Sequence, residues 1–325
     1  MRDAVIVGAG HNGLVAAAYL ARAGLDVEVL ERRDIVGGAC VTEELWPGVR
    51  ASPGAYTLSL LRRRIIADLD LHAHGLHVET HEPYLFAPQP DGRKVVTWST
   101  RERTHAQLTA DWSPADADGY AAWADRWAAA AERARPLMLE PADRERWLDA
   151  IGPEILDGSI AGDLAGIPSE AVRVPFAIQG LIGTLAGPSD PGTAFVGFFH
   201  DLGEVMPDGS WGFARGGMGA VTAALRAAAE AAGARVRTDA TVTDILVDES
   251  RQAAVGVVLE SGEELRSGAV LSGADPLTTA RLASLPRPPG WQQAGPVVKV
   301  MVLLDGLPDF PSWPGSEPWA GTIDV

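Results

Sequence analysis

The first thirty residues alternate between short apolar runs and turns bounded by glycine. Residues 3–8 form a β-branched run that stops at a glycine, which is typical of a parallel strand buried on both faces. Residues 13–23 are alanine-rich and predict a helix that ends at Gly24. Residues 26–31 alternate polar and apolar side chains and predict a second strand. The pattern therefore predicts a parallel βαβ unit.

The turn between the first strand and the helix carries Gly8, Gly10 and Gly13, with His11 and Asn12 between them. The first glycine allows the tight turn, the second lets a pyrophosphate approach the backbone, and the third lets the helix pack close to the strand. The start of the helix offers N–H groups and a partial positive charge to phosphates. These five residues are the predicted pyrophosphate site, and the backbone of His11 matters there more than its ring.

Glu31 ends the second strand, 18 residues after Gly13. A carboxylate at this place accepts hydrogen bonds from both ribose hydroxyls, and it disfavours the 2′-phosphate of NADP. A glycine-rich turn without a ligand is the alternative interpretation. The βαβ context favours a dinucleotide, because the glycines, the helix end and Glu31 all occur at the positions that a dinucleotide-binding βαβ unit requires.

Farther along, two short apolar runs around a turn predict a hairpin within residues 84–98. Residues 114–135 predict a helix in which Trp123 and Trp127 share one face. We interpret that face as core-facing rather than as the wall of a substrate tunnel. Glycines and prolines in residues 152–192 predict short helices and loops.

A second α/β segment lies between residues 211 and 275. After Arg215 and a Gly-Gly-Met turn, the pattern predicts a helix over residues 220–232. Short strands are predicted after it, at residues 234–238, 241–247, 254–260, 263–266 and 269–272. Alone this order fits any α/β module. Its order after the βαβ unit makes the pattern more informative.

Composition narrows the classes of partner. The 325 residues carry 27 Lys and Arg against 43 Asp and Glu, a formal charge of −16. This acidity argues against nucleic acid and against electrostatic docking on an anionic membrane, while leaving peripheral contact between an apolar patch and lipid open. The pattern shows no membrane span and no secretory signal, so we expect a cytoplasmic protein.

Cys40 is the single cysteine, so an intrachain disulfide and a thiolate metal cluster are both excluded. We expect Cys40 to pack as a small apolar group rather than to act as a reactive thiol. Histidines gather between residues 72 and 81 without the spacing of a zinc motif. We therefore expect no metal site, and we interpret the isolated His200 as structural.

Downstream of Glu31 the chain continues with Arg32, Arg33 and then Gly37-Gly38-Ala39-Cys40-Val41-Thr42. With the glycine triplet and the acid, this stretch resembles the FAD-dependent amine oxidase and phytoene desaturase superfamily. Within it the sequence is most similar to phytoene desaturase-like oxidoreductases, including those of the pyridine nucleotide-disulfide oxidoreductase domain-containing protein 2 type.

The resemblance implies FAD as the cofactor. Glu31 would hold the adenosine ribose, while Arg32, Arg33, Gly37, Gly38 and Ala39 would follow the pyrophosphate toward the flavin. Gly54 and Tyr56 would lie in a loop near the flavin ring, and the backbone of Val242 would pair with the adenine. An ordinary Pro-Gly turn is an equal alternative for the loop, and Tyr56 and Arg215 enter only by their place in the pattern.

The resemblance also implies a discontinuous domain organisation. A Rossmann-like α/β FAD-binding domain would use residues 1–75 and 211–285, interleaved with an α+β substrate domain of residues 76–210 and 286–325. The sequence covers about two thirds of the pattern of the family. No glycine-rich flavin segment follows Trp291. We therefore expect a fragment or a truncated product with an incomplete isoalloxazine site.

The expected activity is hydride transfer from a C–H bond of an apolar or amphipathic small molecule to the flavin. Two alternatives remain: a non-catalytic binding protein, such as a prenyl-protein chaperone on the same fold, and an NAD-dependent dehydrogenase. Glu31 argues against the non-catalytic binding protein, which need not keep a carboxylate for the ribose. The Gly37-Gly38 pair argues against the NAD-dependent dehydrogenase. The sequence assigns no catalytic acid or base, substrate, electron acceptor or oligomeric state.

Overall fold

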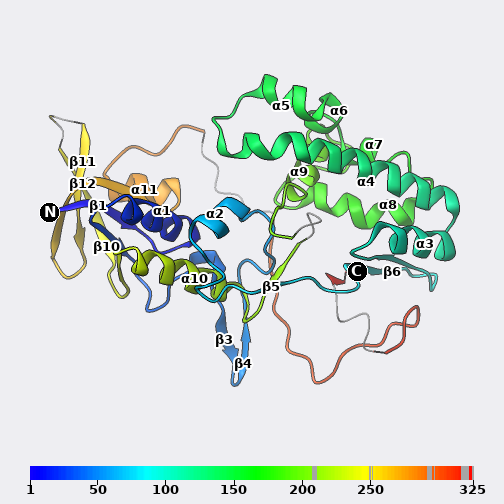
Figure 1. The fold of residues 1–325 in the computed structure, drawn as a ribbon, viewed down its shortest axis with the longest axis horizontal. Coiled ribbons are helices and arrows are strands. Elements are labelled where there is room, and N and C mark those ends of the chain that lie inside the picture. Colours follow the sequence, from blue (N-terminus) through cyan, green and yellow to red (C-terminus); the bar gives the residue numbers. More distant parts are fainter. Residues whose placement is uncertain are drawn as a thin grey trace. The chain divides into compact units, whose positions relative to one another are not determined.

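The computed structural model describes residues 1–206, 211–248, 250, 252–290, 295, 297–315 and 322–323. The chain divides into two compact units. Unit 1 comprises residues 1–58, 62–79 and 213–294, and unit 2 comprises residues 59–61, 80–212 and 295–325. In Figure 1, blue elements from the N-terminus and yellow to orange elements from the second half belong to unit 1. Each unit is thus assembled from segments far apart in sequence, and their roles toward cofactor and substrate stay predictions.

A mixed sheet forms the centre of unit 1. Its described strands have the order β10-β11-β12-β1-β2-β9, with the bounds β1 (Arg2–Val7), β2 (Val27–Leu30), β9 (Arg235–Arg237), β10 (Val242–Asp248), β11 (Ala253–Leu259) and β12 (Glu264–Ser272). β1 runs parallel to β12 and β2, and β2 runs parallel to β9, whereas β10, β11 and β12 form an antiparallel ladder. The predicted α/β fold with a parallel sheet is confirmed.

The register of β1 and β2 places the predicted site. Val7 pairs with Leu30, so Gly8 and Glu31 follow at the same edge of the sheet. The side chains of both strands are buried from Ala4 to Val7 and from Val27 to Leu30. The apolar run of β1 and the valines and leucine of β2 are the buried positions that predicted these two strands from the sequence.

The end of the sheet differs from the sequence prediction in one respect. Residues 263–266 and 269–272 were expected as two short strands, but Glu264–Ser272 is a single strand, β12. Its first residues pair antiparallel with β11, and from Ser267 onward it pairs in parallel with β1. The strand changes partner without a break, and the glycine at position 268 packs close to the Asp3 carbonyl.

Helices and small sheets complete unit 1. They are α1 (His11–Arg22), η1 (Gly38–Cys40), α2 (Arg63–Asp68), α10 (Met218–Ala231), α11 (Pro276–Leu282) and the strand pairs β3 (Glu43–Trp46) with β4 (Val49–Ala51) and β5 (Val78–Glu79) with β8 (Phe213–Ala214). α1 begins two residues earlier than predicted, because Gly10 is its N-cap. α1 and α10 pack against each other.

Unit 2 is mainly helical. The predicted hairpin is present as β6 (Leu85–Pro88) and β7 (Lys94–Thr97), with β13 (Thr322–Ile323) parallel to β6. The helices are α3 (Arg101–Asp111), α4 (Pro114–Ala134), η2 (Arg135–Leu139), α5 (Arg144–Ile151), α6 (Pro153–Leu156), α7 (Ile160–Asp163), α8 (Glu170–Ala177), η3 (Ile178–Leu181) and α9 (Thr193–His200). Ser113 caps α4, because its hydroxyl accepts a hydrogen bond from the Asp116 N–H at 3.1 Å.

The core of unit 2 gathers around one face of α4. Trp123 and Trp127 are both buried there, and their rings pack at a centroid distance of 4.5 Å. Phe198 of α9 meets the Trp127 ring edge-on at 5.6 Å. The core-facing interpretation of the tryptophan pair is confirmed. Among the described helices, none combines the length and the apolar character needed to cross a bilayer.

Candidate functional site

The turn from β1 into α1 is shaped by its three glycines. Gly8 has a φ of +94°, and its N–H donates to the Leu30 carbonyl at 2.8 Å. A Cβ at Gly13 would collide with the Gly8 carbonyl oxygen, so only glycine permits this packing. A Cβ at Gly10 would instead project into open space, with no atom of the described residues within 4 Å. Gly10 is therefore where a ligand can approach the backbone.

The N-terminus of α1 lies at the same point. Gly10 is its N-cap and has no side chain with which to satisfy the first-turn N–H groups. His11 and Asn12, the first two helical residues, are exposed. An uncapped helix start next to an open backbone favours an anionic group such as a phosphate.

Glu31 is fixed beside this turn. Its side chain is 8% exposed. Oε2 accepts a hydrogen bond from the Ala9 N–H at 2.9 Å, and Oε1 accepts one from the Arg33 N–H at 3.1 Å. A carboxylate has about four acceptor positions, so each oxygen can still accept a hydroxyl. The carboxylate holds the glycine turn in place and remains able to bind a diol.

The second glycine segment lies next to the first. The Gly37 N–H donates to the Ala9 carbonyl at 2.8 Å, and Gly37 forms a parallel bridge with Gly10. Gly37 and Gly38 have φ values of +131° and +60°, and a Cβ on Gly38 would lie 3.3 Å from the Gly10 Cα. The structure thus brings together the two glycine segments that the sequence singled out.

The neighbouring predicted residues take different places. Arg32 and Ala39 are exposed, whereas the Arg33 guanidinium pairs with Glu43 of β3. Gly54 packs against Ala39 so closely that a Cβ would collide with the Ala39 carbonyl oxygen, which also accepts the Ala55 N–H at 2.8 Å. Gly54 therefore has a packing role whether or not it touches a ligand.

Val242 reaches this edge of the sheet through the residues before it. The Ala240 N–H donates to the Glu31 carbonyl at 2.8 Å, and the Asp239 N–H donates to the Arg33 carbonyl at 3.0 Å. Val242 then opens β10 with its side chain buried. The segment from 239 to 242 is thus hydrogen-bonded to the strand end that carries Glu31.

Sequence reasoning missed the support behind the second glycine segment. The Thr42 hydroxyl accepts the Gly219 N–H at 2.8 Å, and the Ser52 hydroxyl accepts the Met218 N–H at 3.0 Å. Together they cap α10. From α10, the Thr222 hydroxyl donates to the Cys40 carbonyl at 3.1 Å. The Thr42 end of the glycine stretch and the Gly-Gly-Met turn were both noticed, but their contact spans the sequence and has no local signal.

Cys40 and His11 face each other, with 3.6 Å between Sγ and Nδ1. Burial raises the pKa of the Cys40 thiol and lowers the pKa of the His11 imidazole. Both groups are therefore neutral near pH 7, and their contact is not a thiolate–imidazolium pair. This agrees with Cys40 as a packed small group beside the turn.

We call the group formed by Gly8, Gly10, Gly13, Glu31, Gly37 and Gly38 the cradle, and the other predicted residues have the following surroundings. Tyr56 is 54% exposed, and the Arg215 side chain pairs with Glu79, with Nε 3.0 Å from Oε1. In the histidine group, the His72 Nδ1 lies 2.8 Å from the Leu76 carbonyl. Within the described ranges no three His, Cys, Asp or Glu side chains gather as metal ligands would.

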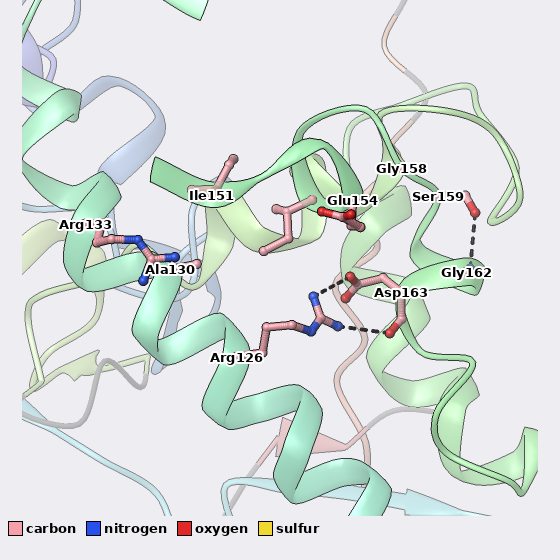
Figure 2. Close-up of a pocket in the computed structure, with 10 residues that line it drawn as sticks. Arg126, Ala130, Arg133, Ile151, Glu154, Gly158, Ser159, Gly162 and Asp163 are labelled. Carbon is pink, nitrogen blue, oxygen red and sulfur yellow. Dashed lines mark hydrogen bonds and ion pairs between the residues drawn. The ribbon is translucent and has the colours of Figure 1, made fainter. Parts of the chain in front are cut away.

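A separate cavity of about 410 Å³ lies in unit 2 between α4 and the turns from α5 to α7 (Figure 2). Figure 2 shows Arg126 and Arg133 of α4 on one side and Glu154 and Asp163 on the other. Arg126 donates to the Asp163 carboxylate at 2.8 Å, and Arg133 donates to the Ala150 carbonyl at 2.7 Å. These charges serve the fold, so we do not assign the cavity a ligand.

The cradle of unit 1 has the features that a dinucleotide cofactor needs. Open space at Gly10, an uncapped helix start and a buried acid meet where two glycine segments touch. The Arg33 guanidinium pairs with Glu43, and the uncapped N–H groups at the start of α1 are the donors that an anion at Gly10 would meet.

The family model for flavin containing amine oxidoreductases matches residues 13–319. The pyridine nucleotide-disulfide oxidoreductase domain-containing protein 2 of Rattus norvegicus is 34% identical over 369 residues, which cover 98% of this chain and 63% of the relative. A phytoene desaturase (neurosporene-forming) of Cereibacter sphaeroides is 27% identical over 285 residues, or 84% of this chain and 52% of the relative.

Among solved structures, an oxidoreductase from Methanosarcina mazei matches with a TM-score of 0.58 at 19% identity, covering 86% of this chain and 61% of that chain. This likeness concerns the fold. The chain spans just under two thirds of the length of the rat relative. The length of the family match, together with the rat relative, places the protein in a family: it belongs to the flavin-containing amine oxidoreductases.

Proposed function

We propose that the cradle of unit 1 binds FAD, and that the chain is part of an oxidoreductase removing hydride from a C–H bond of an apolar or amphipathic substrate. The observation that carries the proposal is the contact between Gly10 and Gly37 beside the Glu31 carboxylate. A long dinucleotide contacts the protein backbone beyond one turn. A second glycine segment lying next to the first is therefore expected for such a ligand.

Each part of the cradle has its own task in this proposal. Gly8, Gly10, Gly13 and the first N–H groups of α1 would hold the pyrophosphate. Glu31 would accept the ribose hydroxyls, and the backbone at Val242 would meet the adenine. Gly37, Gly38 and Ala39 would line the path toward the flavin. The openness at Gly10 and the remaining acceptor positions of Glu31 support these assignments.

The bound flavin would supply the hydride acceptor. The chain's own residues would bind and orient it, because the glycine turn, the acid and α10 are joined by the hydrogen bonds described above. The apolar or amphipathic nature of the substrate is supported by the similarity to a phytoene desaturase. We propose no catalytic acid or base, and we keep the cytoplasmic location as a proposal.

The test is a visible absorption spectrum of the purified chain, before and after incubation with FAD and desalting. Retained flavin bands are expected. Glu31→Gln keeps the size of the side chain and removes its charge. Because hydrogen bonds to charged groups contribute about 1.5–3 kcal/mol, FAD affinity should fall roughly tenfold to a hundredfold.

Glu230→Gln is the matched control, since Glu230 lies on α10 of the same unit and pairs with Arg226 on the surface. It should bind FAD like the parent. A chain that is folded by circular dichroism, retains no flavin and binds NADH would contradict the FAD proposal. A folded chain that binds neither cofactor would contradict it in favour of a non-catalytic binding protein.

A further inference from the structure

The side chain of His11 links the two glycine segments of the cradle. His11 is the first residue of α1 after the N-cap Gly10, and Cys40 is the last residue of η1. Their side chains meet with 3.6 Å between Nδ1 and Sγ. The imidazole therefore lies where the helix start and the second glycine segment come together.

Cys40 is a fixed partner for this ring. Its side chain is buried, its N–H donates to the Gly37 carbonyl at 2.9 Å, and its carbonyl accepts the Thr222 hydroxyl of α10 at 3.1 Å. Gly37 in turn donates to the Ala9 carbonyl at 2.8 Å. The turn after β1 and the helix α10 thus set the position of the thiol, which can hold the imidazole in one orientation.

The contact also selects the tautomer of His11. Near pH 7 the thiol keeps its proton and the imidazole is neutral, because burial raises the pKa of Cys40 and lowers the pKa of His11. A neutral imidazole has one N–H donor and one nitrogen that accepts. The thiol S–H donates to Nδ1, since sulfur is only a weak acceptor. The ring proton is then on Nε2, which has no hydrogen-bond partner among the described residues.

The surroundings of the ring lack a counter-charge for an imidazolium. Burial is what lowers the pKa of His11, and no charged side chain of the described residues adds to that effect. Glu31 is engaged by two backbone N–H groups, and the Arg33 guanidinium pairs with Glu43. From α10, which packs against α1, the uncharged Thr222 contacts this region. The positive end of the α1 dipole also disfavours a cation, so an anion at the helix start would supply the missing charge.

We propose that the His11 ring binds the pyrophosphate of the cofactor: Nε2–H donates to a phosphate oxygen, and the imidazole takes up a proton from solvent as the pyrophosphate binds. Cys40 is the positioning residue, because its thiol holds the ring with Nε2 as the free donor. This inference rests on the proposal that the cradle binds FAD. It adds to the backbone N–H groups of α1 a side chain whose charge changes with pH.

The contact couples cofactor binding to pH. The two phosphate charges raise the pKa of His11 in the complex, as a close opposite charge does. In the free protein the pKa of His11 lies below its ordinary value. Between these two values the complex holds a proton that the free protein has lost. The affinity for FAD therefore falls as the pH rises through this window.

The experiment is a flavin-fluorescence titration of the purified 325-residue chain with FAD. It is carried out at about pH 5.5 and about pH 8, where the parent should bind FAD about fivefold or more tightly at the lower pH. His11→Gln replaces the ring with an amide N–H donor that does not titrate. It should keep the affinity of the parent within a few-fold at the higher pH and lose the gain at the lower pH.

Proton uptake is measured directly by calorimetric titration with FAD in two buffers of different ionisation enthalpy. Inside the window the parent should take up a fraction of a proton, and His11→Gln should take up none. His105→Gln is the matched control, since His105 pairs with Asp118 at the surface of unit 2. It should keep both the pH profile and the proton uptake of the parent.

Cys40→Ala and Cys40→Ser test the positioning role, once circular dichroism has shown that both variants are folded. Alanine removes the donor to Nδ1 and should weaken FAD binding about two- to tenfold at the higher pH, the range for loss of a neutral hydrogen bond. Serine keeps a hydroxyl donor at the same place and should recover most of the loss. Equal weakening by both variants would overturn the positioning role of Cys40.

The outcomes separate this inference from the proposed function. A folded parent chain that binds no FAD at either pH would overturn both. A parent that binds FAD equally at the two pH values would overturn the role of the ring and leave the FAD site in place. A pH dependence that His11→Gln retains would do the same, because another group would then be responsible.

Discussion

The hydroxyl of Thr42 accepts a hydrogen bond from the backbone N–H of Gly219 at 2.8 Å, across 177 positions of sequence. This contact joins the residues after the second glycine pair to the first turn of α10. Gly217 has no room for a side chain there, because a Cβ would lie 2.5 Å from the Thr42 Oγ1. The cradle thus depends on a helix contributed by the second half of the chain.

Thr42→Val should destabilise unit 1 by about 1 kcal/mol, within the range for loss of an N-cap hydroxyl. Valine has nearly the same shape, but it cannot accept the Gly219 N–H. Urea denaturation followed by far-UV circular dichroism measures the change. Thr243→Val on β10 is the control, since valine suits a strand, and it should change the free energy of unfolding by less. Equal effects would show that the cap contributes nothing.

Gly13→Ala should destabilise the fold by about 1–3 kcal/mol, as expected for overpacking at a close backbone contact. The added Cβ collides with the Gly8 carbonyl oxygen, which cannot move without distorting the turn. Thermal unfolding of the purified variant is the measurement. A melting temperature equal to that of the parent would show that α1 shifts away from β1 at little cost.

Gly10→Ala should separate ligand binding from folding. Its Cβ meets no atom in the part of the chain that the structure describes, and Gly10 has a φ of −71°, which alanine adopts freely. We expect a cost in stability of at most about 1 kcal/mol, since glycine is only a modestly favoured N-cap. FAD retention after desalting should nevertheless fall. Retention equal to that of the parent would mean that the ligand does not approach Gly10.

Asp163→Ala should destabilise unit 2 by about 3–5 kcal/mol, because it leaves buried donors and a charge without their partner. The Asp163 side chain is 1% exposed. Its Oδ2 accepts the indole N–H groups of Trp123 and Trp127 at 2.8 and 2.7 Å, and its Oδ1 accepts from Arg126.

Asp157→Ala is the control for this change, because Asp157 pairs with Arg144 at the surface. Exposed pairs contribute about 0–1 kcal/mol. Guanidinium denaturation, monitored by tryptophan fluorescence, compares the two variants. Similar losses in both would show that Asp163 behaves as a surface carboxylate.

The carboxyl of Asp201 should make unit 2 less stable as the pH rises. Burial raises the pKa of Asp201 to about 7, although Arg101 and Arg135 lower it. Tyr120 lies near enough for Asp201 to contribute to raising the tyrosine's pKa, which burial chiefly brings to about 12. The unfolded chain has an ordinary aspartate with a pKa near 4. Between about pH 4 and pH 7 the folded state therefore holds a proton that the unfolded state has lost, and the free energy of unfolding falls.

Asp201→Asn should remove this fall. Relative to the parent, it should gain about 1–3 kcal/mol on going from near pH 5 to near pH 8, an order of magnitude set by the linkage between pKa and stability. Urea denaturation at both pH values measures the difference. Asp149→Asn, at an exposed position of α5, is the control. If Asp201→Asn shows the same pH dependence as the parent, another group is responsible.

Local patterns were sufficient for the first βαβ unit. Val5 and Val29 lie on adjacent strands of the central sheet, and Glu31 follows the second strand as the alternation predicted. The glycine positions were also readable, because their spacing reflects sterics within one turn. The membership of the superfamily, inferred from the stretch around Gly37 and Gly38, is confirmed by the family match.

The long-range parts had no such signal. No sequence pattern near Thr42 predicts that its hydroxyl caps a helix starting at Met218. Similarly, no pattern near Asp163 predicts its two indole partners from α4. Likewise, the separate strands expected before and after Ser267 are one strand, because its pairing with β1 is set by the tertiary fold. Side chains that act across the chain become visible only once the backbone is placed.

The sheet of unit 1 sets a waiting time during protein synthesis. β1 is synthesised well before β12, one of its two neighbours in the sheet, which ends at Ser272. At roughly 5–20 residues per second, the nascent β1 edge stays without that neighbour for on the order of 10–50 seconds. Such an apolar edge is open to wrong pairing in the meantime. Translation speed and chaperone occupancy over this interval should therefore influence the yield of folded protein.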